Sequence, residues 1–131
     1  MAYILAGLMA AASFLLNRLF IRRFGEGAIT KLGPALEEAA KTLPAYWLGA
    51  DILATHVAFG VVEAGYDFFS SSRRKTAAAL AGIAGHSLFG LLAAGAISWT
   101  QNAWLGFAAG WAAHAAWNSA IMYLVKLRSR N

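Results

Sequence analysis

The chain has 131 residues, of which 60% are hydrophobic and 13% are charged, and its mean hydropathy is +0.55. A water-soluble domain carries roughly a quarter charged residues, so this composition favours a membrane protein, with a length that suits one compact unit. The absence of cysteine excludes disulfides and thiolate chemistry. The net charge of +5 does not indicate nucleic-acid binding, because the basic residues form short clusters between apolar stretches.

Four apolar segments are long enough to cross a bilayer, since a hydrocarbon core of about 30 Å needs about 20 helical residues. They cover residues 2–20, 46–69, 76–99 and 103–125. The first is interpreted as a retained span, because basic residues follow it and none precedes it; a cleaved signal is the alternative. A fifth candidate, residues 27–44, is short and polar.

Lysine and arginine collect on the cytoplasmic side of membrane proteins, and their positions predict how many segments cross. Clusters follow the first, the 46–69 and the last segments: Arg22 and Arg23; Arg73, Arg74 and Lys75; Lys126, Arg128 and Arg130. If the first segment and the 46–69 segment both end on the cytoplasmic side, the chain must cross the membrane outward between them. Only residues 27–44 can form that crossing. The sequence therefore predicts one all-α transmembrane domain, residues 1–131, a bundle of five transmembrane helices with its N-terminus outside and its C-terminus cytoplasmic. A re-entrant second segment is the alternative.

Two further patterns agree with this topology. Aromatic rings anchor at membrane interfaces, and four of them fall at the proposed outer interface: Tyr46, Trp47, Trp99 and Trp104. Gly106 and Gly110 form a small-xxx-small pair, which predicts a close helix contact.

Ionisable side chains occur within the predicted spans, although each costs at least about 2.5 kcal/mol near the bilayer centre. They are Glu37, Glu38, Lys41, Asp51, His56, Glu63, Asp67, His86 and His114. Such residues normally face the bundle interior and mark a functional site. Counted at about 1.5 Å per residue from the inner ends, groups on four different helices reach similar depths. The sequence therefore predicts that acid, imidazole and amide groups meet at one level.

These residues form four motifs in chain order. Residues 37–41 read EExxK, residues 59–63 read FxxxE, His86 stands alone on the next span, and residues 114–118 read HxxxN. Together, over residues 36–118, they resemble the PrsW family of intramembrane proteases. They are more distantly similar to the CAAX prenyl-protease and bacteriocin-processing (CPBP, or Abi) families, which have EExxxR and FxxxH instead. Lys41 and Glu63 therefore favour the PrsW family.

The resemblance implies a glutamate- or metal-dependent endopeptidase. Its implied catalytic residues are Glu37, Glu38, Glu63, His86, His114 and Asn118, with Glu37 as the general base that activates water. The two histidines and Asn118 would stabilise the oxyanion; alternatively, Glu63, His86 and His114 would bind zinc. The expected partners are a membrane-anchored protein or peptide substrate and the lipid bilayer, with a homodimer left open and no nucleic acid. The expected location is the plasma membrane of a prokaryote.

Other interpretations remain open at this stage. Lys41 can reach either glutamate, and we predict Glu38 as its main partner; alternatively its ammonium extends to the membrane interface. His56 matches no motif and is interpreted as a packing or tuning residue. Buried acids and histidines also build proton relays, so a proton-coupled small transporter or channel is the competing function. A catalytically inactive membrane binding or scaffold protein is the third alternative.

Overall fold

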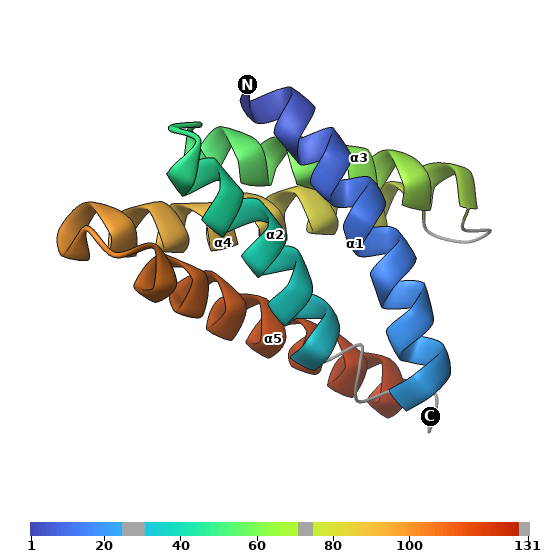
Figure 1. Cartoon of the computed structure of the whole chain (residues 1–131). Coiled ribbons are helices and arrows are strands. Elements are labelled where there is room, and N and C mark those ends of the chain that lie inside the picture. The colour runs from blue at the N-terminus through green and yellow to red at the C-terminus, as the bar shows by residue number, and fades with distance from the viewer. Residues whose placement is uncertain (25–30, 71–74, 129–131) are drawn as a thin grey trace.

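The computed structural model describes residues 1–24, 31–70 and 75–128, and over these residues it contains five α-helices and no strand (Figure 1). The helices are α1 (Ala2–Phe24), α2 (Gly33–Trp47), α3 (Ile52–Ser70), α4 (Lys75–Thr100) and α5 (Ala103–Arg128). The predicted all-α architecture with five helices is confirmed. The predictions that involve residues 27–30, Ser72, Arg73, Arg74 and Arg130 fall outside the described residues, as do those for the side chains of Asp67 and Lys75.

The predicted boundary between the second and third segments was wrong. Helix α2 continues through Pro44 to Trp47, and α3 begins only at Ile52. The chain turns at Gly49, whose φ of +64° suits a residue without a β-carbon. Two hydrogen bonds close this turn, from Gly49 N–H to Tyr46 O at 3.3 Å and from Ala50 N–H to Ala45 O at 2.8 Å. This is the Schellman pattern of a helix C-terminus, and Gly49 was its sequence signal.

Within the part of the chain that the structure describes, one helical segment, Ala79–Thr100 of α4, is long and apolar enough to cross a membrane, with 22 residues and a hydropathy of 1.7. Shorter apolar segments occupy Ala2–Ser13 and Ile52–Tyr66. Helix α2 has 15 residues and spans about 22 Å, less than the hydrocarbon core of about 30 Å. The topology of five transmembrane helices therefore stays a prediction.

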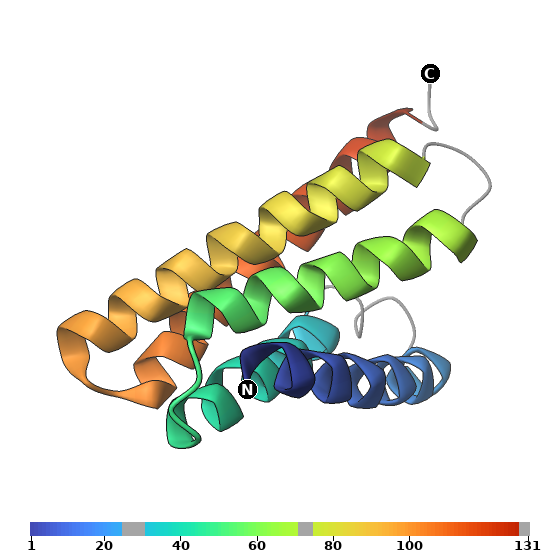
Figure 2. The ribbon, with the colours of Figure 1, turned by 90° about the horizontal axis from the view of Figure 1, so that it is seen from above.

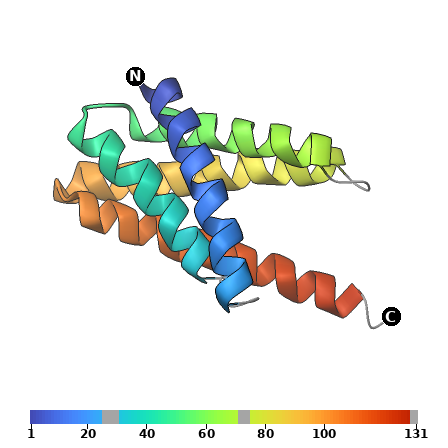
Figure 3. The same cartoon turned by 45° about the vertical axis from the view of Figure 1, so that its right-hand side comes forward.

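Successive helices run in alternating directions. Helices α3 and α4 lie side by side, and α5 returns along α4 after a short turn (Figures 1 and 2). Helices α1 and α2 pack together and cross over the layer that α3, α4 and α5 form (Figure 3). Helix α2 contacts both α3 and α5, so its inward face meets side chains from both.

That inward face of α2 is polar. Its buried residues follow a helical stripe: Gly33, Pro34, Glu37, Glu38, Lys41, Thr42, Leu43 and Ala45. The predicted glycine pair of α5 makes room for the neighbours on both sides. Gly106 packs against Ile97 and the backbone oxygen of Ala93 on α4, and Gly110 faces the Glu38 carboxylate. The fold therefore buries charged groups at its centre, where α2, α3, α4 and α5 meet.

Aromatic side chains from α2 and α5 meet at one end of the bundle. The Tyr46 hydroxyl donates to the backbone oxygen of Gln101 at 3.1 Å, and the Trp47 and Trp104 rings meet edge to face at 6.3 Å. The end of α2 and the α4–α5 turn therefore lie on the same side, as the sequence predicted; which side of a membrane this is stays a prediction.

Candidate functional site

Glu38 is the centre of a buried ionic cluster. Its Oε1 atom lies 2.6 Å from Lys41 Nζ and 2.9 Å from His114 Nδ1, while its Oε2 atom lies 2.9 Å from His56 Nε2. The side chains of Glu38, Lys41 and His56 are fully buried. Both carboxylate oxygens are therefore engaged, by groups from α2, α3 and α5.

Lys41 extends the cluster to α4. Its Nζ atom also lies 2.9 Å from His86 Nδ1 and 4.5 Å from the centre of the Phe59 ring. His86 in turn uses Nε2 for a hydrogen bond with Glu63. The Glu63 side chain is 41% exposed, whereas that of His86 is 3% exposed. A continuous chain of polar contacts thus runs from the exposed edge at Glu63 to the closed interior at Glu38.

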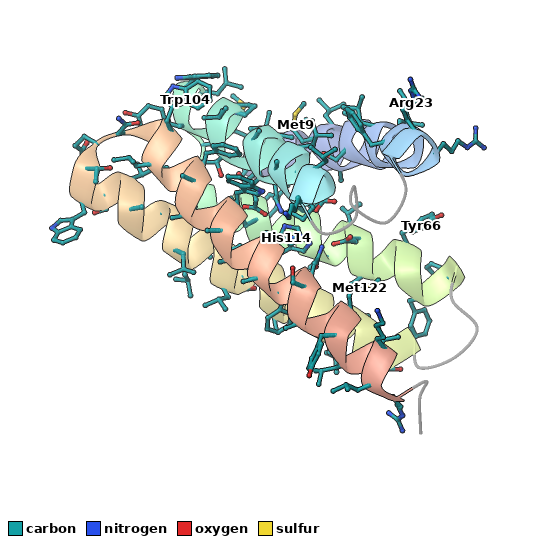
Figure 4. All side chains as sticks on the ribbon, turned by 90° about the horizontal axis from the view of Figure 1, so that it is seen from below. Met9, Arg23, Tyr66, Trp104, His114 and Met122 are labelled. Atoms are coloured by element: carbon teal, nitrogen blue, oxygen red, sulfur yellow. The ribbon has the colours of Figure 1, made fainter. Side chains whose placement is uncertain are left out.

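The partners determine which ring nitrogens carry protons. A lysine ammonium only donates, so Nδ1 of His86 accepts and its Nε2–H donates to Glu63. A carboxylate only accepts, so Nδ1–H of His114 donates to Glu38. The other nitrogen of His114, Nε2, lies 3.8 Å from Glu37 Oε2. Figure 4 shows His114 in the middle of the bundle, between α5 and α2.

Aromatic rings form the wall of the site. Phe89 stacks on His114 with 4.6 Å between ring centres, and it meets His86 edge to face at 5.7 Å. Phe59 lies 5.3 Å from His86 on the other side. Phe59 and Phe89 are both buried. These rings fix the two imidazoles and exclude water from the inner part of the cluster.

Three glycines allow the helices to approach at the site. A β-carbon on Gly60 would lie 2.9 Å from His86 Cβ, and one on Gly90 would lie 2.6 Å from His56 Cβ. A β-carbon on Gly110 would lie 2.7 Å from Glu38 Oε2. Real β-carbons avoid such distances, so each glycine creates the space that a cluster residue occupies.

The structure brings most of the predicted site residues together. Glu38, Glu63, His86 and His114 belong to the connected cluster, and Glu37 lies beside His114. Asn118 lies one helical turn beyond His114 and is half-buried. The predicted pairing of Lys41 with Glu38 is confirmed, and the alternative of Lys41 extending to the interface was wrong. Asp51 lies outside the cluster, where its carboxylate accepts from Ala54 N–H at 2.6 Å at the start of α3.

His56 is the cluster residue that the motifs missed. It was interpreted as a packing or tuning residue, yet it contacts the central carboxylate directly. The signal for its position was present in the spacing of His56, Gly60 and Glu63, which places all three on one face of α3.

Among the described residues, two groups of side chains have ligand atoms close enough together to hold a metal ion. One consists of Glu38, His86 and His114, and the other of Glu37, Glu63 and His86; within each group the atoms lie within 4.8 Å of one another. The predicted zinc set of Glu63, His86 and His114 is divided between them. In the first group, the Lys41 ammonium already bridges Glu38 and His86, where a bound cation would lie.

No protein-family model matches the chain, and no curated protein or solved structure matches it. The resemblance to the PrsW family therefore stays a prediction from four short motifs, and the function is argued below from the geometry of the site.

Proposed function

We propose that this protein is a small intramembrane protease in which Glu37 activates water for hydrolysis of a membrane-anchored protein or peptide. The membrane location is supported by an inverted distribution of side chains. Charged groups meet in the interior, whereas large apolar residues cover the outside of the helices, among them Leu80, Leu91 and Leu92 on α4 and Ile121, Leu124 and Val125 on α5. Water-soluble proteins rarely expose apolar surface on this scale.

The observation that carries the proposal is the meeting of Glu37, Glu63 and His86. These residues come from three helices, and one ligand atom of each lies within 4.8 Å of the others. This spacing suits a single water molecule held by all three groups. The Glu63 side chain is the most exposed of the three, so water and substrate enter from that side.

The two adjacent glutamates have different roles. Both oxygens of Glu38 are engaged by Lys41, His114 and His56, so Glu38 is a poor base. Glu37 faces the proposed water instead and serves as the general base. Glu38 orients His114 through Nδ1–H, in the way that a buried carboxylate orients the imidazole of a hydrolase.

The proposed reaction follows from these positions. Glu37 takes one proton from the water as the water oxygen bonds to the peptide carbonyl carbon, and the carbonyl oxygen becomes an oxyanion. Asn118, on the same face of α5 as His114, supplies an amide N–H to this oxyanion. The carbon–nitrogen bond then breaks, and His114 Nε2 passes the proton from Glu37 to the leaving nitrogen. The products are a carboxylic acid and an amine.

Lys41 argues for a mechanism without metal. A metal-binding histidine normally directs its second nitrogen to a carboxylate or a carbonyl, whereas Nδ1 of His86 faces an ammonium. That positive charge repels a metal ion at either group. Lys41 instead supplies the positive charge that the carboxylates require, and no step of the proposed reaction passes through zinc.

The geometry is a weaker fit to the competing transport function. A proton pathway across a membrane requires polar groups that continue toward both sides. Here the contacts run inward from Glu63 and end at Glu38, Lys41 and His56, all fully buried. The connected contacts have one exposed end, at Glu63, which suits a reaction site better than a pathway across a membrane.

The proposal is tested with the purified protein in liposomes that contain single-span peptides of varied sequence, with products identified by mass spectrometry. We expect cleavage by the wild type and a loss of about 10²-fold or more in Glu37→Gln, as for other general bases. Asp51→Asn is the matched control, because it makes the same chemical change outside the cluster and asparagine also caps a helix. Cleavage at the wild-type rate in Glu37→Gln, or none by the wild type, would contradict the proposal.

A further inference from the structure

His56 lies in the centre of the cluster although it belongs to none of the four motifs. Its side chain is fully buried, and each ring nitrogen has its own partner. Nε2 lies 2.9 Å from Glu38 Oε2, and Nδ1 lies 2.9 Å from the backbone oxygen of Ile52. A histidine that served only to fill space would not need two polar partners.

Both partners of His56 are acceptors. The backbone oxygen of Ile52 cannot donate. Glu38 is a carboxylate, because it also receives the Lys41 ammonium and the Nδ1–H of His114 on its other oxygen. Both nitrogens of His56 thus face acceptors, and both contacts are satisfied as hydrogen bonds when each nitrogen carries a proton.

We infer that His56 is a positioning residue: a buried imidazolium that fixes Glu38 Oε2 and so leaves Oε1 to Lys41 and His114. The consequence for catalysis rests on the proposed function, since Glu38 acts there by orienting His114. A positive charge on His56 is also compatible with the complete burial of its side chain. Lys41 and His56 place two cations among the carboxylates of Glu37, Glu38 and Glu63, and a buried carboxylate is tolerated only when it is paired in this way.

Two features of the fold hold His56 in place. On its own helix, the backbone oxygen of Ile52, one turn earlier, accepts from His56 Nδ1–H at 2.9 Å. On α4, Gly90 provides the space, since a β-carbon there would lie 2.6 Å from His56 Cβ. The ring is therefore fixed from its own helix, from α4 and from Glu38 on α2.

The first test needs no substrate. Nitrogen-15 NMR of the purified protein in nanodiscs at neutral pH distinguishes one protonated ring nitrogen from two, and the chain has only three histidines. We expect two protonated nitrogens in His56, Nε2–H alone in His86 and Nδ1–H alone in His114. The spectrum of His56→Gln assigns the His56 signals. A neutral His56 ring would overturn the inference whatever the protein's activity.

The second test measures cleavage per folded protein. His56→Leu removes both donors, whereas His56→Gln keeps an amide N–H that can reach Glu38. We expect kcat to fall about 10- to 100-fold in His56→Leu, because a misplacement of about 1 Å at a catalytic group can cost about 10²-fold, with KM unchanged and partial recovery in His56→Gln. A purely structural residue would instead lower the folded yield and leave kcat unchanged in both variants. That result would overturn the positioning role, while an inactive wild type would contradict the proposed function and leave the NMR result standing.

Discussion

Lys41 Nζ lies 2.6 Å from Glu38 Oε1, three residues earlier on α2, and both side chains are fully buried. Removing one member of such a pair leaves an uncompensated charge in the interior, whereas removing both does not. Each of Glu38→Gln and Lys41→Met should therefore lower the free energy of unfolding by about 3–5 kcal/mol. The double variant should cost less than the sum of the two, by about 1–3 kcal/mol.

Chemical unfolding of the four proteins in the same detergent measures this cycle. The cleavage rate per folded protein distinguishes the stabilising role of Glu38 and Lys41 from the catalytic role of Glu37. Glu38→Gln and Lys41→Met should retain measurable cleavage, and Glu37→Gln should not. Strictly additive costs would mean that the two charges do not stabilise each other. An equal loss of activity from both glutamates would mean that they share one catalytic role.

The second prediction concerns the other polar groups of the site, which are Glu63 and His86 beside the proposed water and His114 beside Glu37. Glu63→Gln, His86→Ala and His114→Ala should each remove most of the cleavage and leave a folded protein. Glu63 and His86 are hydrogen-bonded to each other, and His114 Nε2 lies 3.8 Å from Glu37 Oε2. Ser87→Ala is the control, because Ser87 follows His86 in the chain but donates only to Ile83 O of its own helix. If two of the three variants cleave at the normal rate, the cluster is structural.

The features of this site that could be predicted from the sequence are those that depend on the spacing of residues within a single helix. The stripe on α2 predicted that Glu37, Glu38 and Lys41 share a buried face. The spacing placed Lys41 within reach of either glutamate, and the choice of Glu38 came from the resemblance, which assigns the base to Glu37. The depth of His86 and His114 in their segments predicted that they meet. Apart from the choice between the two glutamates, these inferences need only the rise and the periodicity of a helix.

The remainder required the packing of the helices. The contact of His56 with Glu38 depends on how α3 crosses α2, which no motif encodes. The division of the predicted zinc set between two groups also depends on helix packing, and the sequence does not reveal that Lys41 lies between Glu38 and His86. The boundary of α2 was predicted too early, since Gly49 ends the helix after it has continued through Pro44.

The third prediction concerns metal. Because the Lys41 ammonium bridges Glu38 and His86, the wild-type protein should contain far less than one zinc ion per chain, and a chelator should leave its cleavage rate unchanged. In Lys41→Met the resident cation is lost, so added zinc should bind more tightly than it does to the wild type. Elemental analysis and calorimetry measure both effects. Stoichiometric zinc in the wild type, together with inhibition by the chelator, would refute the mechanism without metal.

The fourth prediction uses the glycines that make room for the site. Gly90→Ala and Gly110→Ala should each destabilise the protein by about 1–3 kcal/mol, because the new methyl group overlaps His56 or Glu38. Gly95→Ala on α4 is the matched control, since a β-carbon there meets no described atom within 4 Å. Thermal unfolding in detergent compares the three. Equal stability of Gly95→Ala and Gly110→Ala would mean that α5 does not approach Glu38 this closely.

The last prediction concerns the orientation of the helices in the membrane. The natural chain has no cysteine, so a single introduced cysteine reports its own position. With five spans, Ser72→Cys should react with an impermeant thiol reagent only from the cytoplasmic side, because basic residues flank it. Asn102→Cys, in the uncharged turn between α4 and α5, should react only from outside.

Helix α2 provides a sharper form of the same experiment. Tyr46 donates to Gln101 O, so the end of α2 and the α4–α5 turn lie on one side, and Leu48→Cys should react from the same side as Asn102→Cys.

Leu32→Cys, at the other end of α2, distinguishes a helix that spans the membrane from a re-entrant one. Because α2 is only about 22 Å long, its start reaches the cytoplasmic side only if the bilayer is thinner there or if water enters the protein as far as the start of α2. Reaction of Leu32→Cys from the cytoplasm supports five spans, and reaction from outside supports the re-entrant alternative. Reaction of Ser72→Cys and Asn102→Cys from one and the same side would refute both topologies, because α4, which joins them, would then not cross the membrane.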